Sequence, residues 1–201
     1  DGVVAESNAI KDAAFREFFA RYPDHAEAMQ AFHREHHARP RRFKFTHLAR
    51  DLMGEDEAAV DRMAEDFSAL VADRVVGCPE VPGAGAFMRE FSDRLPLYVS
   101  SVTPHEELLR IVADRGLAPY FKEVFGDPPH AKTDTVRHIL EREVLPAGQA
   151  VFVGDSPSDW RVAQETEVAF IGRDSGQAFP EAAPDPLPDM HAVAAALRSL
   201  L

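Results

Sequence analysis

The sequence contains a single cysteine, Cys78, among its 201 residues. One cysteine excludes an internal disulfide and any centre built from several thiolates, so we expect no disulfide framework and no cysteine zinc site. Apolar runs are also short, because none approaches the roughly 18 residues that a membrane-spanning helix requires. No secretory signal opens the chain. We therefore expect a cytoplasmic protein with no membrane partner.

Positive charge is scarce as well. The chain has 22 Lys and Arg residues against 34 Asp and Glu residues, which gives a formal net charge of −12. A surface of that sign repels nucleic acid and anionic membranes, so nucleic acid is not an expected partner. An anionic substrate would have to meet local positive charge, supplied by a bound cation or by clustered Arg and Lys. The length suits one domain, or one domain that carries an insertion.

Two parts of the chain differ in their hydrophobic periodicity. Residues 7–74 have helical spacing throughout and predict four helices without a strand, the first ending before Pro23 and the others over about 25–37, 42–53 and 57–73. Beyond residue 84, short apolar strands alternate with helices; the strands are expected at 97–99, 123–125, 150–153 and 168–171. This alternation predicts an α/β fold, a Rossmann-like parallel sheet core with helices on both faces and an inserted helical unit.

A polar motif, Gly-Asp-Ser-Pro-Ser-Asp, follows the third predicted strand at residues 154–159. Helix capping explains Ser156 and Pro157, and Asp159 completes a capping-box-like pair with Ser156. Capping leaves Asp155 unexplained at the mouth of a buried strand. Ligands bind at this edge of open α/β sheets, and Mg²⁺ takes one or two carboxylates there. Asp155 is therefore a candidate metal ligand.

A second motif, Val-Ser-Ser-Val-Thr-Pro, follows the first predicted strand. Thr103 and the proline after it form a helix start, which leaves Ser101 free to donate its hydroxyl to an anionic oxygen. Ser100 is a rival, because a shift of one residue along a strand turns the side chain to the other face.

Lys132 lies near the start of a predicted helix, where a cation opposes the helix dipole by roughly 0.3–1 kcal/mol. Two interpretations are open. It is either a tolerated surface lysine or an ammonium turned inward, where a compact point charge neutralises carboxylates and a phosphoryl group.

The start of the chain, Asp1-Gly2-Val3-Val4, adds another acid to this set. With Ser101, Lys132, Asp155 and Asp159 in this order, the chain resembles the phosphatases of the haloacid dehalogenase superfamily, in the branch of phosphoglycolate phosphatase and β-phosphoglucomutase. The resemblance covers about residues 1–7 and 84–172. The first motif of the family reads Asp-x-Asp-Gly, and Asp1 matches its second aspartate. We therefore expect the first strand and the nucleophilic aspartate to lie upstream of Asp1.

The resemblance implies Mg²⁺-dependent removal of phosphate from a small phosphorylated metabolite through an aspartyl-phosphate intermediate. In the family the second aspartate protonates the leaving oxygen, activates water and ligates Mg²⁺ through its backbone carbonyl. Carried over, catalytic roles fall to Asp1, Ser101 and Lys132, and metal ligation to Asp1, Asp155 and Asp159. Ser101 and Lys132 would also bind the phosphate. Asp159 would alternatively orient Lys132.

The resemblance divides the chain into an α/β core, residues 1–7 and 84–201, and a helical cap, residues 8–83. Residues 33–44 of this cap concentrate positive charge in an acidic protein. Either they form a solvated helix end, or Arg41 or Lys44 contacts the anionic or polyhydroxyl part of the substrate when the cap closes. The histidines lack a metal-ligand spacing with any acid or cysteine, and we interpret them as polar surface.

Other functions stay open at this point. A phosphomutase of the same superfamily shares all these motifs, whereas Asp1 argues against a dehalogenase. A non-catalytic phosphate-binding module is the alternative if no nucleophile precedes Asp1. We expect a monomer or a homodimer.

Overall fold

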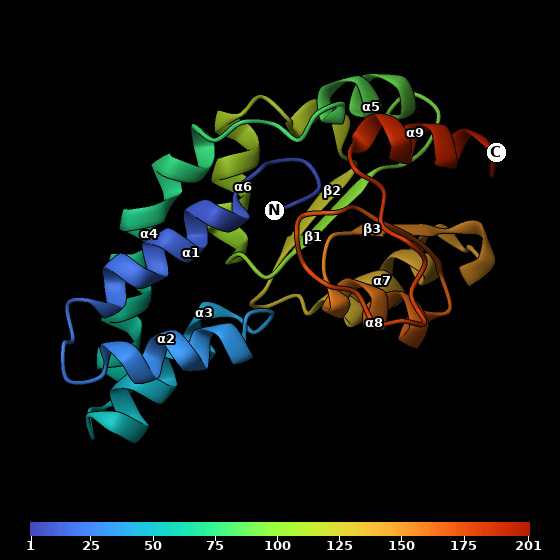
Figure 1. The fold of residues 1–201 in the computed structure, drawn as a ribbon. Coiled ribbons are helices and arrows are strands. Elements are labelled where there is room, and N and C mark those ends of the chain that lie inside the picture. Colours follow the sequence, from blue (N-terminus) through green and yellow to red (C-terminus); the bar gives the residue numbers. More distant parts are fainter.

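The computed structural model describes residues 1–201 and shows two parts side by side (Figure 1). One part is a helical unit with no strand, as predicted, and it contains α1 (Asn8–Phe19), α2 (Ala26–Glu35), α3 (Arg41–Thr46) and α4 (Glu57–Val76). The third predicted helix is divided, because α3 continues as a π-helical segment over His47–Leu52.

An aromatic cluster forms the core of the helical unit. Phe15, Phe18 and Phe19 lie on one face of α1, because positions three and four apart meet on the same side of a helix. The ring of Phe67 from α4 lies 4.3 Å from that of Phe15, and the ring of Phe45 lies 5.0 Å from that of Phe18. These rings are buried and form the core of the unit, to which Ile111 of the second part also belongs.

The second part contains four short parallel strands. They are β1 (Tyr98–Ser101), β2 (Glu123–Gly126), β3 (Val151–Gly154) and β4 (Ala169–Gly172). Strand β1 pairs with β2 and β3 pairs with β4, so the parallel strands form two two-stranded sheets. The physical reason is that no strand within residues 1–201 lies between β1 and β3, so each of them is paired along one edge only.

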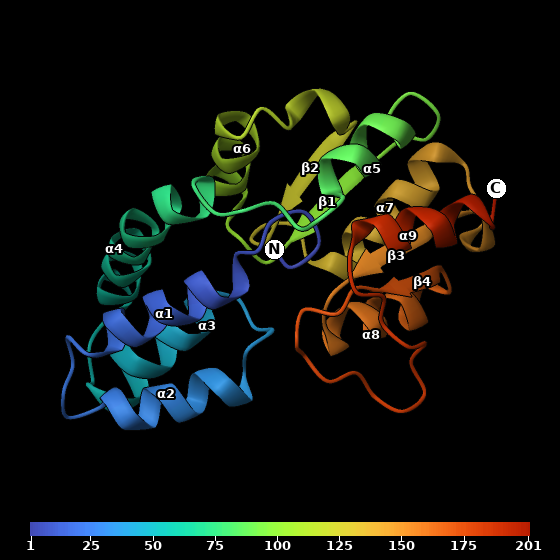
Figure 2. The ribbon, with the colours of Figure 1, turned by 45° about the horizontal axis from the view of Figure 1, so that its top comes forward.

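Helices cover both faces of the strands, as predicted. On one face α5 (Ala84–Phe91), α6 (His105–Asp114) and α9 (Met190–Arg198) enclose a core that includes Val124 of β2 and Ile171 of β4. On the other face α7 (Lys132–Glu143) and α8 (Pro157–Thr166) pack against each other and against the strands (Figure 2). None of the helices combines the length and the apolar character needed to cross a bilayer.

The strand ends meet the helical unit. Strand β1 ends at Ser101 and β3 ends just before Asp155, and both ends line one cavity together with residues at the start of α1. Residue 1 lies between the two parts of the molecule (Figure 1). The fold therefore gathers residues from both parts around one cavity.

Candidate active site

A cavity of about 120 Å³ lies between the helical unit and the carboxyl ends of β1 and β3. Only 4 of its 22 lining residues are hydrophobic, so its wall is suited to a polar or charged ligand. The structure brings every predicted site residue to this wall: Asp1, Arg41, Lys44, Ser101, Lys132, Asp155 and Asp159. Their proximity is thus observed, whereas the role of each one stays a prediction.

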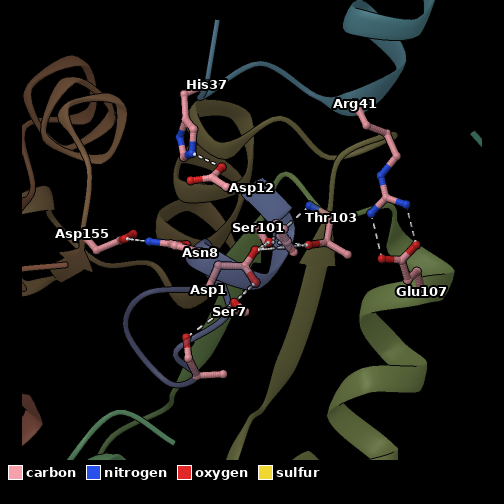
Figure 3. Close-up of polar contacts among 12 residues, drawn as sticks. Asp1, Ser7, Asn8, Asp12, His37, Arg41, Ser101, Thr103, Glu107 and Asp155 are labelled. Atoms are coloured by element: carbon pink, nitrogen blue, oxygen red, sulfur yellow. Dashed lines mark hydrogen bonds and ion pairs between the residues drawn. The ribbon is translucent and has the colours of Figure 1, made fainter. Parts of the chain in front are cut away.

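The carboxylate of Asp1 is held by donors from three segments. Figure 3 shows Ser7, Ser101 and Thr103 among them. Its Oδ1 accepts from Ser7 Oγ at 2.5 Å, and its Oδ2 accepts from Lys11 Nζ at 2.5 Å. Ser101 Oγ and Thr103 Oγ1 each lie 3.3 Å from the same Oδ2. The side chain is 23% exposed, so the carboxylate is positioned and still open to the cavity.

Ser101, and not Ser100, contacts the carboxylate of Asp1. The hydroxyl of Ser101 is buried, lies 3.1 Å from Thr103 Oγ1 and accepts from the backbone N–H of Thr103. The hydroxyl of Ser100 is buried without a partner. The choice of Ser101 from the sequence therefore agrees with the register that the strand adopts.

Lys11 was missed by the sequence analysis. Its ammonium bridges Asp1 Oδ2 and Thr103 Oγ1, at 2.5 and 2.8 Å. Burial, followed by the charge of Arg41, lowers the pKa of Lys11 to about 7, and the charge of Glu107 opposes this shift. One feature of the sequence could have indicated Lys11 as a site residue. Polar residues at 8, 11 and 12 share a face of the first helix, and this helix starts directly after the Asp1 motif.

Asp155 lies against the backbone of Gly2. Its Oδ2 accepts from Asn8 Nδ2 at 2.6 Å, whereas its Oδ1 has no hydrogen-bond partner in the chain. Gly2 has a positive φ of 63°, and a Cβ built on it would lie 1.9 Å from Asp155 Oδ2. A glycine is therefore required here for the carboxylate to approach the chain start.

We expect Gly2→Ala to lower the free energy of unfolding and to displace the Asp155 carboxylate. The matched control is Gly116→Ala, because Gly116 has a similar φ of 69° but open space around the added Cβ. Both variants place an L-residue in the left-handed region, at about 1–2 kcal/mol, and only the first adds the clash. Urea denaturation of both variants measures the difference. Equal losses of unfolding free energy in the two variants would show that the close approach of Gly2 to Asp155 does not affect stability.

Asp159 is fully engaged by neighbouring donors. Its Oδ1 accepts from Lys132 Nζ at 2.6 Å, and its Oδ2 accepts from Ser156 Oγ at 2.7 Å and from the backbone N–H of Asp155. Burial opposes ionisation of Asp159, but Lys132 and then Ser156 outweigh it and lower the pKa of the carboxyl. The arrangement favours the role of orienting Lys132 over that of ligating a metal. It also places the Lys132 ammonium inward, not on the open surface.

The head groups of Arg41 and Lys44 are both occupied. Arg41 forms a bidentate ion pair with Glu107 of α6, at 2.7 and 2.8 Å (Figure 3). It also donates to Ser68 Oγ. Lys44 is 1% exposed and donates to the backbone carbonyls of His37 and Arg39. Burial lowers the pKa of Lys44 to about 8. Both residues line the cavity, and contact with a substrate stays a prediction for each.

The interpretation of all histidines as polar surface is wrong for His33, which is 5% exposed. His33 Nε2 lies 3.0 Å and His37 Nε2 lies 3.1 Å from Asp12 Oδ1. Burial disfavours ionisation of Asp12, but hydrogen bonds from the two rings hold the pKa of its carboxyl below the usual range. Sequence spacing did not reveal this cluster because Asp12 comes from a different helix.

No protein-family model and no curated protein matches the sequence. Solved structures do match the fold. A predicted phosphoglycolate phosphatase from Lactobacillus plantarum aligns with a TM-score of 0.72 and 19% identity, over 100% of this chain and 95% of the other. A predicted β-phosphoglucomutase from Thermotoga maritima aligns with a TM-score of 0.70 and 18% identity, over 100% and 96%.

A third match is the predicted haloacid dehalogenase hydrolase YfnB from Bacillus subtilis, in a magnesium-bound structure. It aligns with a TM-score of 0.68 and 15% identity, over 98% of this chain and 95% of the other. At these identities the likeness concerns the fold. It confirms at that level the resemblance drawn from the motifs: this chain has the fold of the haloacid dehalogenase-like phosphatases.

Proposed function

We propose that this chain is a Mg²⁺-dependent phosphatase that acts on a small phosphorylated metabolite. The observation that carries the proposal is the gathering of Asp1, Ser101, Lys132 and Asp155 around one polar cavity, although they are up to 154 residues apart in the sequence. Hydrolysis of phosphate monoesters is among the slowest uncatalysed reactions, so dense charge stabilisation is needed around the transferred group. The fold supports the same class of reaction.

The proposed roles follow from the contacts. The Ser101 hydroxyl and the Lys132 ammonium donate to phosphoryl oxygens, and Asp159 holds the ammonium in place. The Asp1 carboxylate exchanges a proton with the leaving oxygen and then with water, and Ser7, Lys11 and Thr103 fix its direction. The family resemblance places the nucleophilic carboxylate two residues ahead of Asp1, outside residues 1–201. None of the residues described above takes that role.

The oxygen donors present fit Mg²⁺. Asp155 offers Oδ1, which has no partner in the chain, and the close approach of Gly2 brings the chain start beside this carboxylate. Hard oxygen ligands from one or two carboxylates are what Mg²⁺ takes in phosphate-handling sites. Asp155 and Asp1 would hold the ion, and Asp159 would be a weaker third candidate because both its oxygens are engaged. The bound ion would neutralise charge on the phosphoryl group.

We propose the same division of the chain as the resemblance implies, with residues 8–83 as a cap over the core formed by residues 1–7 and 84–201. The aromatic core of α1–α4 supports this division. Residues of both parts line the cavity, so movement of the cap would open and close it and exclude water during reaction.

Removal of Mg²⁺ tests the proposal directly. The chain is treated with a chelator and assayed for phosphate release from an aryl phosphate, phosphorylated sugars and short phosphorylated acids. We expect release only when Mg²⁺ is restored. The intact mass is measured on the same sample, because it shows which residues precede Asp1. Absence of Mg²⁺-dependent release from a chain with an upstream aspartate would overturn the proposal.

A sugar phosphomutase is the second candidate, favoured by the structural match to the predicted β-phosphoglucomutase. The two functions differ in the fate of the phosphorylated enzyme. A phosphatase releases phosphate to water without an acceptor, whereas a mutase keeps the phosphorylated aspartate until a sugar phosphate arrives. The lifetime of the phosphorylated chain without an acceptor separates them. Phosphate binding by a chain of residues 1–201 alone, without turnover, would indicate a binding module.

A further inference from the structure

The cluster of Asp12, His33 and His37 is unexplained by the proposed phosphatase chemistry. Asp12 belongs to α1, His33 lies in the last turn of α2, and His37 lies just beyond that helix. One potential ligand atom from each residue lies within 4.8 Å of the other two. All three side chains line the same cavity as Asp1 and Asp155. Figure 3 shows two of them, Asp12 and His37.

The arrangement of these atoms suits a tetrahedral ion. Zn²⁺ binds imidazole nitrogen and carboxylate oxygen at about 2.0–2.1 Å, which places neighbouring ligand atoms of a tetrahedron about 3.3 Å apart. The two nitrogens lie 3.0 and 3.1 Å from Asp12 Oδ1. The two nitrogens lie within 4.8 Å of each other, so all three ligand atoms are near the spacing of a tetrahedral site.

The polar contacts within the cluster all meet at one atom. Both rings converge on one oxygen, whereas Asp12 Oδ2 accepts no hydrogen bond. His33 is buried against the ring of Phe15, at 4.3 Å between centroids, and its Nδ1 has no partner. The only polar anchor of the His33 ring is therefore Asp12 Oδ1.

We propose that Asp12, His33 and His37 bind a divalent transition-metal ion of the Zn²⁺ type, with an open coordination position toward the cavity. Two imidazoles and one carboxylate suit such ions, whereas Mg²⁺ prefers oxygen ligands. Three protein ligands with one position free is the arrangement of zinc sites that also bind an exogenous ligand. The open position would take an oxygen or nitrogen atom of a molecule held in the cavity. The site is distinct from the proposed Mg²⁺ position at Asp155 and does not depend on it.

Calorimetric titration with Zn²⁺ tests the site on the full chain after chelator treatment. We expect one ion per chain, and no displacement by millimolar Mg²⁺. His37→Ala and Asp12→Asn are each expected to weaken binding by more than roughly 100-fold, beyond the range reached by residues that only support a ligand. The matched control is His36→Ala, which removes a neighbouring histidine that packs edge-to-face against Phe32 and lies outside the cluster.

Titration with Co²⁺ gives a second readout, because a tetrahedral site yields intense visible absorption and adventitious surface binding does not. Thermal unfolding of each variant without metal verifies that the helical unit is intact. The proposal is overturned if Zn²⁺ does not bind, if Mg²⁺ displaces it, or if His36→Ala weakens binding as much as His37→Ala. Unchanged binding by a folded His37→Ala variant would overturn it as well.

Discussion

Replacing Asp155 by asparagine is expected to lower kcat/KM for phosphate-ester hydrolysis by at least about 100-fold, the loss typical of one electrostatic group in a preorganised site. The substitution keeps the shape and the contact with Asn8, but it removes the negative charge beside Gly2 that would hold Mg²⁺. Activity should also become nearly independent of Mg²⁺. Steady-state kinetics across a Mg²⁺ titration measures both effects.

Asp134→Asn is the matched control for this prediction. Asp134 lies in the first turn of α7, close in sequence to Lys132, but its side chain is 79% exposed. The Asp134→Asn variant loses the same charge, but outside the cavity. Its activity and Mg²⁺ dependence should therefore match those of the parent chain. The stability of the Asp155 variant should not fall, because the change relieves repulsion from nearby carboxylates. Full Mg²⁺-dependent activity in Asp155→Asn would remove Asp155 from the proposed site.

The second large effect is expected on stability. Glu107→Gln removes the charge partner of Arg41, whose side chain is 7% exposed while that of Glu107 is 8% exposed. A buried guanidinium without a counter-charge costs about 3–5 kcal/mol of unfolding free energy. Because Arg41 belongs to α3 and Glu107 to α6, the loss should loosen the join between the helical unit and the α/β part. Urea denaturation provides the measurement.

Two further variants make this result specific. The double change Arg41→Met with Glu107→Leu should recover most of the loss, because apolar pairs of similar volume replace buried ion pairs at little cost. Glu17→Gln breaks an exposed pair with Arg74 and should leave the denaturation midpoint unchanged. The losses of unfolding free energy are also measured for Arg41→Met and Glu107→Leu alone. If the loss in the double variant equals the sum of these two losses, the ion pair is not the source of the effect.

The same ion pair bears on the predicted role of Arg41 in substrate binding. A guanidinium that is already bound by two carboxylate oxygens has few donors left for a ligand. Substrate contact by Arg41 would therefore require either a shared contact with Glu107 or a rearrangement when the cap moves. Kinetic changes in an Arg41 variant are interpretable only beside its unfolding free energy.

Local patterns in the sequence were sufficient for most of the elements and for the positions of the candidate residues at the strand ends. The run Val151–Gly154 is apolar and β-branched, and it ends at a helix start that Ser156 caps, so the position of Asp155 at a strand mouth follows from local chemistry. Ser101 was identified in the same way. Parallel strands place such ends at one edge, which is why the polar motifs were expected to meet.

What the sequence by itself determined is therefore the order of helices and strands, the helical unit, and the residues at the strand ends, because these depend on neighbours within a few positions. The tertiary structure alone decided the rest. It showed two separate strand pairs, the ion pair between Arg41 and Glu107, and Lys11 against Asp1. It also brought Asp12 to His33 from another helix. These features depend on packing between distant segments, which no local pattern encodes.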